Sequence, residues 1–207
     1  ANKWVSRGSG KLIGALDAFP AIDVNGRVCV DAGASTGGFT AILLERGAVR
    51  VFSIDVGYGQ LAWSLQQDPR VVVMDRFNVR HLSATDLDQP ADLVVADLSF
   101  ISLRTVLPAL RSSVEPSADF VLMVKPQFEV GRERLGKNGV VRDADVRADA
   151  VMGVARSAAD IGLGCAGIEA SPLPGPSGNV EYFLWLRQDS PPMREDDVAR
   201  AVADGPQ

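Results

Sequence analysis

Apolar and β-branched residues gather in seven short runs along the 207-residue chain, separated by polar or glycine-rich segments. Most of the first five runs are apolar at nearly every position, which leaves no side for water. Such strands are typical of a parallel sheet that helices cover on both faces. The pattern therefore predicts strands over residues 27–33, 49–56, 70–76, 92–99, 119–127, 165–171 and 181–187.

Helical patterns lie between these runs, at 37–48, 59–68, 102–113 and 144–162. This alternation predicts a doubly wound sheet. The last two strands have only "SPLPGPSGNV" between them, which is too short for a crossover helix, so we expect the last strand to run antiparallel. The predicted fold is α/β and Rossmann-like, of the class I methyltransferase type: a seven-stranded, mostly parallel sheet with an antiparallel last strand and helices on both faces.

The composition of the chain indicates domain boundaries and a cellular compartment. With 46% hydrophobic residues the chain suits one α/β core, which we assign to 1–188; the polar tail 189–207 is expected to fray except for one short helix. The net charge of −5 disfavours a stand-alone RNA-binding module. Cys29 and Cys165 show no metal-binding spacing, so we expect no metal and a reducing, cytoplasmic setting. No apolar run approaches ~18 residues, so no stable membrane insertion is expected.

The glycine-rich "DAGASTGGFT" follows the first strand, where nucleotide-like ligands bind. No Lys follows the glycines as in a phosphate loop, and the spacing G-x-x-x-G-G differs from the dinucleotide fingerprint. A nucleoside cofactor, S-adenosylmethionine, fits better: Asp31 would bind its ammonium group, Asp55 its ribose, and Asp75 or Asn78 its adenine. The alternative is that these are ordinary turn residues. The predicted cofactor site comprises Asp31, Gly33, Ala34, Ser35, Thr36, Gly37, Gly38, Phe39, Asp55, Val56, Asp75, Asn78 and Asp97.

Four charged residues are expected to meet at the same sheet edge. Asp97 and Lys125 end the fourth and fifth strands, Glu181 begins the antiparallel last strand, and Lys11 precedes the first. A sugar hydroxyl needs help to lose its proton, and a lysine beside a second cation has a lowered pKa. We therefore predict that Lys125 deprotonates or steers a hydroxyl, that Asp97 and Glu181 orient it, and that Lys11 biases its charge. Alternatively, the lysines are solvated surface charges.

The acceptor is predicted to be oxygen. "DLSF" differs from the D/N-P-P-F/Y/W signature of enzymes that methylate an exocyclic amine. His81, the sole histidine, follows the cofactor region and is read as a surface residue.

Six stretches together resemble the TlyA family of ribosomal RNA 2′-O-methyltransferases, also named hemolysins, whose domain is similar to FtsJ-type methyltransferases. They are "VSRGSGKL", "DAGASTGGFT", "DVGYGQLAWSL", "DLVVADLSFISL", "VKPQFEVG" and "SPLPGPSGNVEYFLWL". The match runs from Lys3 to Arg187. It implies a catalytic tetrad of Lys11, Asp97, Lys125 and Glu181, and a cytidine 2′-hydroxyl substrate in small- and large-subunit ribosomal RNA. Relatives usually show S-R-G-A-H-K where this chain has "SRGSGK", so a role of that histidine is lost while Lys11 is kept.

The resemblance also implies an upstream RNA-binding domain, joined by a linker that residues 1–6 would belong to. The predicted RNA contacts are Arg7, Lys11, Arg132, Arg134 and Lys137, the last three in the Gly-punctuated segment 128–142. The alternative for that segment is a solvated loop. Three rival functions are disfavoured. A membrane-acting hemolysin lacks support because no spanning segment is seen and the pattern forms a sheet. A nicotinamide-dependent oxidoreductase does not suit the glycine spacing or the seventh strand, and the intact tetrad argues against a domain that binds S-adenosylmethionine without catalysis.

Overall fold

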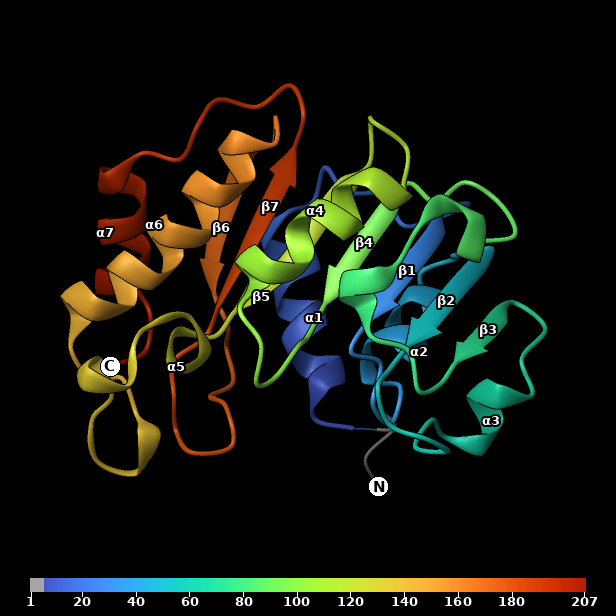
Figure 1. Cartoon of the computed structure of the whole chain (residues 1–207), viewed down its shortest axis with the longest axis horizontal. Coiled ribbons are helices and arrows are strands. Elements are labelled where there is room, and N and C mark those ends of the chain that lie inside the picture. The colour runs from blue at the N-terminus through green and yellow to red at the C-terminus, as the bar shows by residue number, and fades with distance from the viewer. Residues whose placement is uncertain (1–5) are drawn as a thin grey trace.

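The computed structural model describes residues 6–207, so most of the predicted linker, residues 1–5, lies outside the described part. Within that part the strands form one seven-stranded sheet in the order β3-β2-β1-β4-β5-β7-β6 (Figure 1). Each predicted strand is present; all are shortened at one or both ends except the sixth, which begins one residue earlier and ends one residue earlier than predicted. The strands are β1 (Val28–Ala32), β2 (Arg50–Ile54), β3 (Val71–Met74), β4 (Leu93–Ala96), β5 (Asp119–Val124), β6 (Gly164–Ala170) and β7 (Tyr182–Arg187).

The direction of the last strand agrees with the prediction. Strands β1 to β5 pair in parallel, whereas β7 pairs antiparallel with both β5 and β6. β7 lies between these two strands, with Val124 opposite Tyr182. Because β7 runs backwards, its first residues lie at the same edge as the carboxyl ends of the parallel strands.

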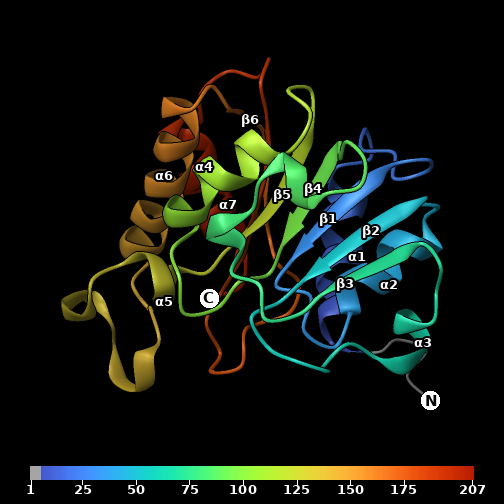
Figure 2. The same cartoon turned by 45° about the vertical axis from the view of Figure 1, so that its right-hand side comes forward.

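Helices cover both faces of the sheet, as predicted (Figure 2). One core cluster packs α4, α6 and α7 against one face, and a second packs α1 and α2 against the other. The helices are α1 (Gly8–Ala18), α2 (Gly38–Glu45), α3 (Trp63–Gln66), α4 (Leu103–Ser113), α5 (Pro126–Glu129), α6 (Ala144–Asp160) and α7 (Glu195–Asp204), with 3₁₀ turns η1 (Val79–His81), η2 (Ala84–Asp86), η3 (Arg132–Arg134) and η4 (Lys137–Gly139).

Two segments differ from the sequence pattern. The helix predicted over 59–68 shrinks to α3, because Gly59 has a φ of +65° and Ala62 is extended. The tail contains the predicted helix, α7, and this helix packs against the domain. Val198 and Val202 of α7 are buried in the same core cluster as α6.

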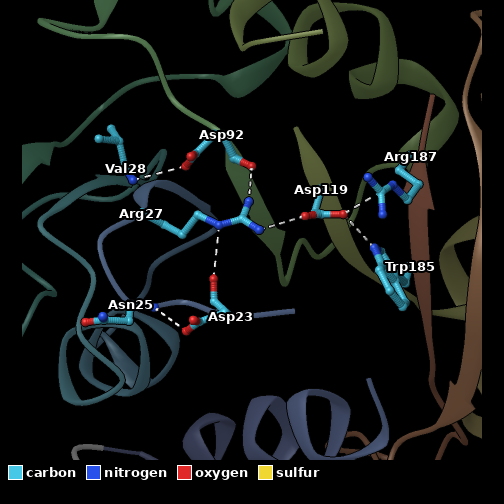
Figure 3. A network of polar contacts seen from close by, with 8 residues as sticks. All are labelled: Asp23, Asn25, Arg27, Val28, Asp92, Asp119, Trp185 and Arg187. Atoms are coloured by element: carbon cyan, nitrogen blue, oxygen red, sulfur yellow. Dashed lines mark hydrogen bonds and ion pairs between the residues drawn. The ribbon is translucent and has the colours of Figure 1, made fainter. Parts of the chain in front are cut away.

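A polar network fastens the amino-terminal edge of the sheet (Figure 3). The Arg27 guanidinium donates to the Asp92 carbonyl at 3.0 Å and to Asp119 Oδ2 at 3.1 Å. Asp119 Oδ1 accepts a hydrogen bond from Trp185 Nε1 at 2.8 Å and lies 3.8 Å from Arg187 Nε. This network joins β1, β4, β5 and β7 at the edge opposite the predicted site.

Candidate active site

The glycine loop between β1 and α2 is held tightly against neighbouring loops. Gly33 has a φ of +82°, and a Cβ there would lie 2.2 Å from the Asp97 carbonyl oxygen. Gly37 has a φ of +102°, and a Cβ would lie 2.2 Å from Leu65 Cδ1. The N–H groups of Gly33 and Ala34 both donate to the Ile54 carbonyl. Glycine is therefore required here by left-handed backbone and by close packing.

A cleft of about 590 Å³ opens beside this loop. Its volume lies in the range of about 300–1,000 Å³ that small-molecule sites occupy. Asp55 stands on one wall, where its two oxygens accept hydrogen bonds from the N–H groups of Ser35 and Gly57, each at 2.8 Å. The lining residues are Gly33, Ser35, Ile54, Asp55, Val56, Gln60, Phe77, Asn78, Val79, Asp97, Leu98, Ser99, Phe100 and Ile101.

A smaller cavity of about 220 Å³ adjoins the cleft and shares Gly33, Ser35 and Asp97 with it. The start of α1 forms its far wall. It is lined by Ser6, Arg7, Gly8, Gly33, Ala34, Ser35, Thr36, Gly38, Phe39 and Asp97. The two spaces together bring in most of the predicted cofactor residues, and they add Ser6 and Gly8, which the sequence reasoning missed.

Asp31 is placed differently from the prediction, since it lines neither cavity and is fully buried. Thr40 Oγ1 donates to Asp31 Oδ2 at 2.7 Å and lies 2.7 Å from Ser53 Oγ, whereas Asp31 Oδ1 has no partner among the described residues. Burial raises the pKa of Asp31 to about 7, and the hydrogen bond from Thr40 opposes this. Contact of Asp31 with a cofactor stays a prediction that this geometry does not support.

Asp75 and Gly37 also lie outside both cavity linings. Asp75 Oδ2 accepts a hydrogen bond from Gly59 N–H at 3.0 Å, so it shapes the 57–60 loop. Asn78 does line the cleft, and its side-chain oxygen accepts from Arg80 N–H at the start of η1. Of the two residues predicted for adenine, only Asn78 lines the cleft, and its contact with adenine stays a prediction.

The predicted catalytic residues form two ion pairs. Lys125 Nζ lies 2.5 Å from Asp97 Oδ1 and 3.1 Å from Ser99 Oγ. The Lys125 side chain is buried, whereas that of Asp97 keeps 25% of its surface exposed and faces both cavities. Because Asp97 and Lys125 end adjacent parallel strands, the sheet itself brings them together.

The second pair joins α1 to β7. Lys11 Nζ lies 2.7 Å from Glu181 Oε1, and Glu181 is fully buried. Gln127 Nε2 donates to Glu181 Oε2 at 3.5 Å. Because Gln127 follows Lys125 by two residues, the turn that carries Lys125 contacts the second ion pair. Each lysine thus faces a carboxylate, whereas the sequence argument had placed a second cation beside Lys125. The influence of Lys11 on the charge of Lys125 stays a prediction.

One exposed aromatic side chain lines the cleft and two more lie on the segment after Val56, and the sequence reasoning missed them. Phe100 is 89% exposed at its rim, with its ring centroid 4.9 Å from that of Phe128. Tyr58 and Trp63 are 70% and 71% exposed, and the Arg76 guanidinium lies 4.4 Å from the Tyr58 ring centroid. For Phe100 and Tyr58 the available signal was their place in irregular segments, outside any helical or strand period, where no core explains them. Trp63 lies within the predicted helix 59–68 and gave no such signal.

The basic segment 128–142 is only partly free for a ligand. Arg132 and Lys137 are exposed, but Arg134 is paired with Asp149 at 2.6 Å. Asn179, which is buried, accepts a hydrogen bond from Val141 N–H and donates one to the Gly139 carbonyl. The segment is thereby tied to the loop that precedes Glu181.

Across residues 6–207, no cluster of three or more His, Cys, Asp or Glu side chains is arranged to hold a metal ion. No helix in the same range is long and apolar enough to cross a bilayer.

The chain is similar to known methyltransferases over almost its whole length. It is 60% identical to the 16S/23S rRNA (cytidine-2′-O)-methyltransferase TlyA of Mycobacterium tuberculosis, across 98% of this chain and 77% of that protein. A Streptococcus thermophilus protein of solved structure with hemolysin in its name is 39% identical, with a TM-score of 0.93 over 98% of this chain and 74% of that one. An S-adenosylmethionine dependent methyltransferase from Mesorhizobium loti, 16% identical, shares the fold at a TM-score of 0.58 over 84% of this chain and 96% of that one. Residues 4–188 match the FtsJ-like methyltransferase family, and the chain belongs to that family.

Proposed function

We propose that this chain transfers the methyl group of S-adenosylmethionine to the ribose 2′-hydroxyl of cytidine in small- and large-subunit ribosomal RNA. The name and 60% identity of the Mycobacterium tuberculosis relative support this substrate. One observation carries the chemistry: Asp97 lines both cavities and lies 2.5 Å from the buried Lys125. A buried lysine held by a carboxylate at the edge of a ligand cleft can orient an acceptor hydroxyl through its N–H groups, and a lysine takes up the hydroxyl proton only in its neutral form.

The two cavities fit the two ends of S-adenosylmethionine. Each oxygen of Asp55 accepts one backbone hydrogen bond and keeps a lone pair for a ribose hydroxyl. Val56, Phe77 and Ile101 offer apolar walls for adenine. The smaller cavity beside Arg7 would take the methionine end. When bound, the cofactor supplies a methyl group on a positively charged sulfur.

The chain's own residues then act on the acceptor hydroxyl. With the cofactor bound, the hydroxyl oxygen would take the methyl group that the cofactor supplies, and it would have to give up its proton. Lys125 deprotonates or steers this hydroxyl, while Asp97 and Ser99 hold the lysine in place. Lys11 and Glu181, linked to the same turn through Gln127, border the acceptor side. Proton removal of this kind typically contributes ~10²–10⁴-fold.

RNA would approach over the rim of the cleft. Exposed aromatic rings offer stacking surfaces that unpaired bases use, and Phe100 lines the same cleft as Asp97. Arg7, Arg132 and Lys137 are exposed and available for phosphates, whereas the Asp149 pair weakens the case for Arg134. An upstream RNA-binding domain remains part of the proposal, as does a cytoplasmic setting, where ribosomal subunits are found.

The test is a single-turnover methyl-transfer assay on purified small and large ribosomal subunits, with the enzyme in excess. We expect transfer by the wild-type chain, a loss of ~10²–10⁴-fold in Lys125→Ala, and no change in Arg200→Ala, an exposed control on α7. Calorimetry should show that Lys125→Ala still binds S-adenosylmethionine and that Asp55→Ala does not. Binding without transfer to either subunit by the wild-type chain would favour the non-catalytic alternative.

A further inference from the structure

A buried carboxylate outside the tetrad completes the start of helix α4. Glu129, the last residue of α5, has a side chain that is 2% exposed. Its Oε1 accepts a hydrogen bond from Leu103 N–H at 2.8 Å, and its Oε2 accepts one from Ser102 Oγ at 2.5 Å. The first N–H groups of a helix have no partner within the helix. Glu129 therefore supplies a cap from a different loop, 26 residues further along the chain.

Such an arrangement needs a reason, because α4 already has a local cap. Ser102 Oγ accepts from Arg104 N–H at 3.1 Å, which is the ordinary way to begin a helix. Burying a carboxylate is costly unless hydrogen bonds compensate, and burial raises the pKa of Glu129 while its bonds to Ser102 and Leu103 oppose this. Arg104 adds further contacts, donating to the Glu129 carbonyl at 3.1 Å and lying 3.7 Å from Oε2. The result is a firm connection between two loops.

These two loops carry the catalytic pair. The segment before α4 contains Asp97 and Ser99, and α5 begins directly after Lys125. Within α5, Phe128 N–H donates to the Lys125 carbonyl at 2.9 Å, so Glu129 and Lys125 lie on one closed turn. A displacement at Glu129 would therefore be transmitted to Lys125. A misplacement of about 1 Å in an active site can cost ~10²-fold in rate.

We propose that Glu129 is a positioning residue of the methyl transfer, which fixes Lys125 against Asp97 by fastening α5 to the first turn of α4. This inference rests on the proposed function. Glu129 itself touches neither cavity lining, since it is absent from the residues that border the cleft and the smaller cavity. Its effect would appear in kcat and not in cofactor affinity.

The experiment compares three variants in the methyl-transfer assay. Glu129→Ala removes the connection, and we expect kcat to fall about 10–100-fold with the Kd of S-adenosylmethionine within threefold. Glu129→Gln keeps an acceptor for Leu103 N–H and should restore most of the rate. Asp143→Ala is the control for the loss of a helix cap as such, because Asp143 is the local N-cap of α6 and accepts from Asp145 N–H at 2.8 Å. We expect it to lower stability and leave kcat unchanged.

A double-mutant cycle separates positioning from general weakening. If Glu129 acts through Lys125, Glu129→Ala should cause little further loss in a Lys125→Ala background. Losses that multiply, or an unchanged kcat in Glu129→Ala, would overturn the inference. If Glu129→Ala does not fold, Ser102→Ala removes one of the two bonds and should cost about 3–10-fold in kcat, and an unchanged kcat there would overturn it equally. Inactivity of the wild-type chain would instead contradict the proposed function.

Discussion

The contribution of Asp31 to the stability of the unliganded protein should fall as the pH rises from about 4 to about 7. This carboxyl group is fully buried under the glycine loop, and burial raises its pKa from the ordinary 3.8 to about 7. In the unfolded chain the same group is ionised above pH 4. Between these two values the folded protein therefore binds a proton that the unfolded chain has released.

The linkage between protonation and folding sets the direction and the size of this change in stability. Where the folded state holds more protons, the free energy of unfolding decreases with pH. The stabilisation is complete below pH 3.8 and is lost as the pH passes the folded value of about 7. A difference of about three pKa units corresponds to about 4 kcal/mol, at 1.36 kcal/mol for each unit. No solvent screening reduces this figure, because the group has no exposed surface.

The assay is urea unfolding of the wild type and of Asp31→Asn between pH 4 and pH 8, without cofactor. The variant cannot ionise, so its stability relative to the wild type should improve by about 4 kcal/mol across this range. Its absolute stability is a poorer readout, since the new amide N–H groups need partners that Asp31 Oδ1 lacks in the described chain. Asp160→Asn, at an exposed position ending α6, controls for charge. Parallel pH profiles for the wild type and Asp31→Asn would refute the reasoning.

Three further perturbations test other parts of the molecule. Asp119→Ala leaves Arg27 without its carboxylate, and we expect a loss of about 2–4 kcal/mol in urea unfolding with kcat retained at 20 °C; a loss below 1 kcal/mol would contradict this. Phe100→Ala should lower kcat/KM on ribosomal subunits about 5–150-fold, equivalent to about 1–3 kcal/mol of base stacking, with Tm unchanged; a change within twofold would argue against stacking. Gly33→Ala drives a Cβ into the Asp97 carbonyl and should weaken S-adenosylmethionine binding at least about tenfold by calorimetry, since left-handed strain alone costs about 1–2 kcal/mol. Undiminished binding of S-adenosylmethionine would show that the glycine loop can shift to accommodate the added Cβ.

The sheet was predictable because its determinants are local. Uniformly apolar runs require cover on both faces, and the short connection 171–180 allows only an antiparallel return. The packing of α7 was not predictable in the same way. Val198 and Val202 are two apolar positions in a polar tail. They are buried only because residues of α6 lie where these two side chains can pack against them. That surface is a property of the tertiary structure.

The candidate site was predictable to the level of strand ends. Asp97 and Lys125 had to meet because their strands are neighbours, and Asp55 had to reach the glycine loop for the same reason. The burial of Asp31 could not be predicted from the sequence. A shift of one residue along the strand decides whether a carboxylate is buried in the core or faces a cleft. The connection through Glu129 was equally hidden, since it depends on how two loops pack across the sheet edge.

Backbone strain is concentrated beside the cleft. Outside glycine, the described chain has positive φ at Ser35, Arg76, Phe100 and Asn138, and the first three lie on loops that form or adjoin the cleft wall. Each such residue costs of the order of 1–3 kcal/mol and persists only if its surroundings hold it. Ser35 N–H is bound by Asp55, and Arg76 N–H by the Gly57 carbonyl. The same hydrogen bonds that shape the cleft therefore maintain its strain, so Asp55→Ala should loosen the glycine loop as well as remove the proposed ribose contact.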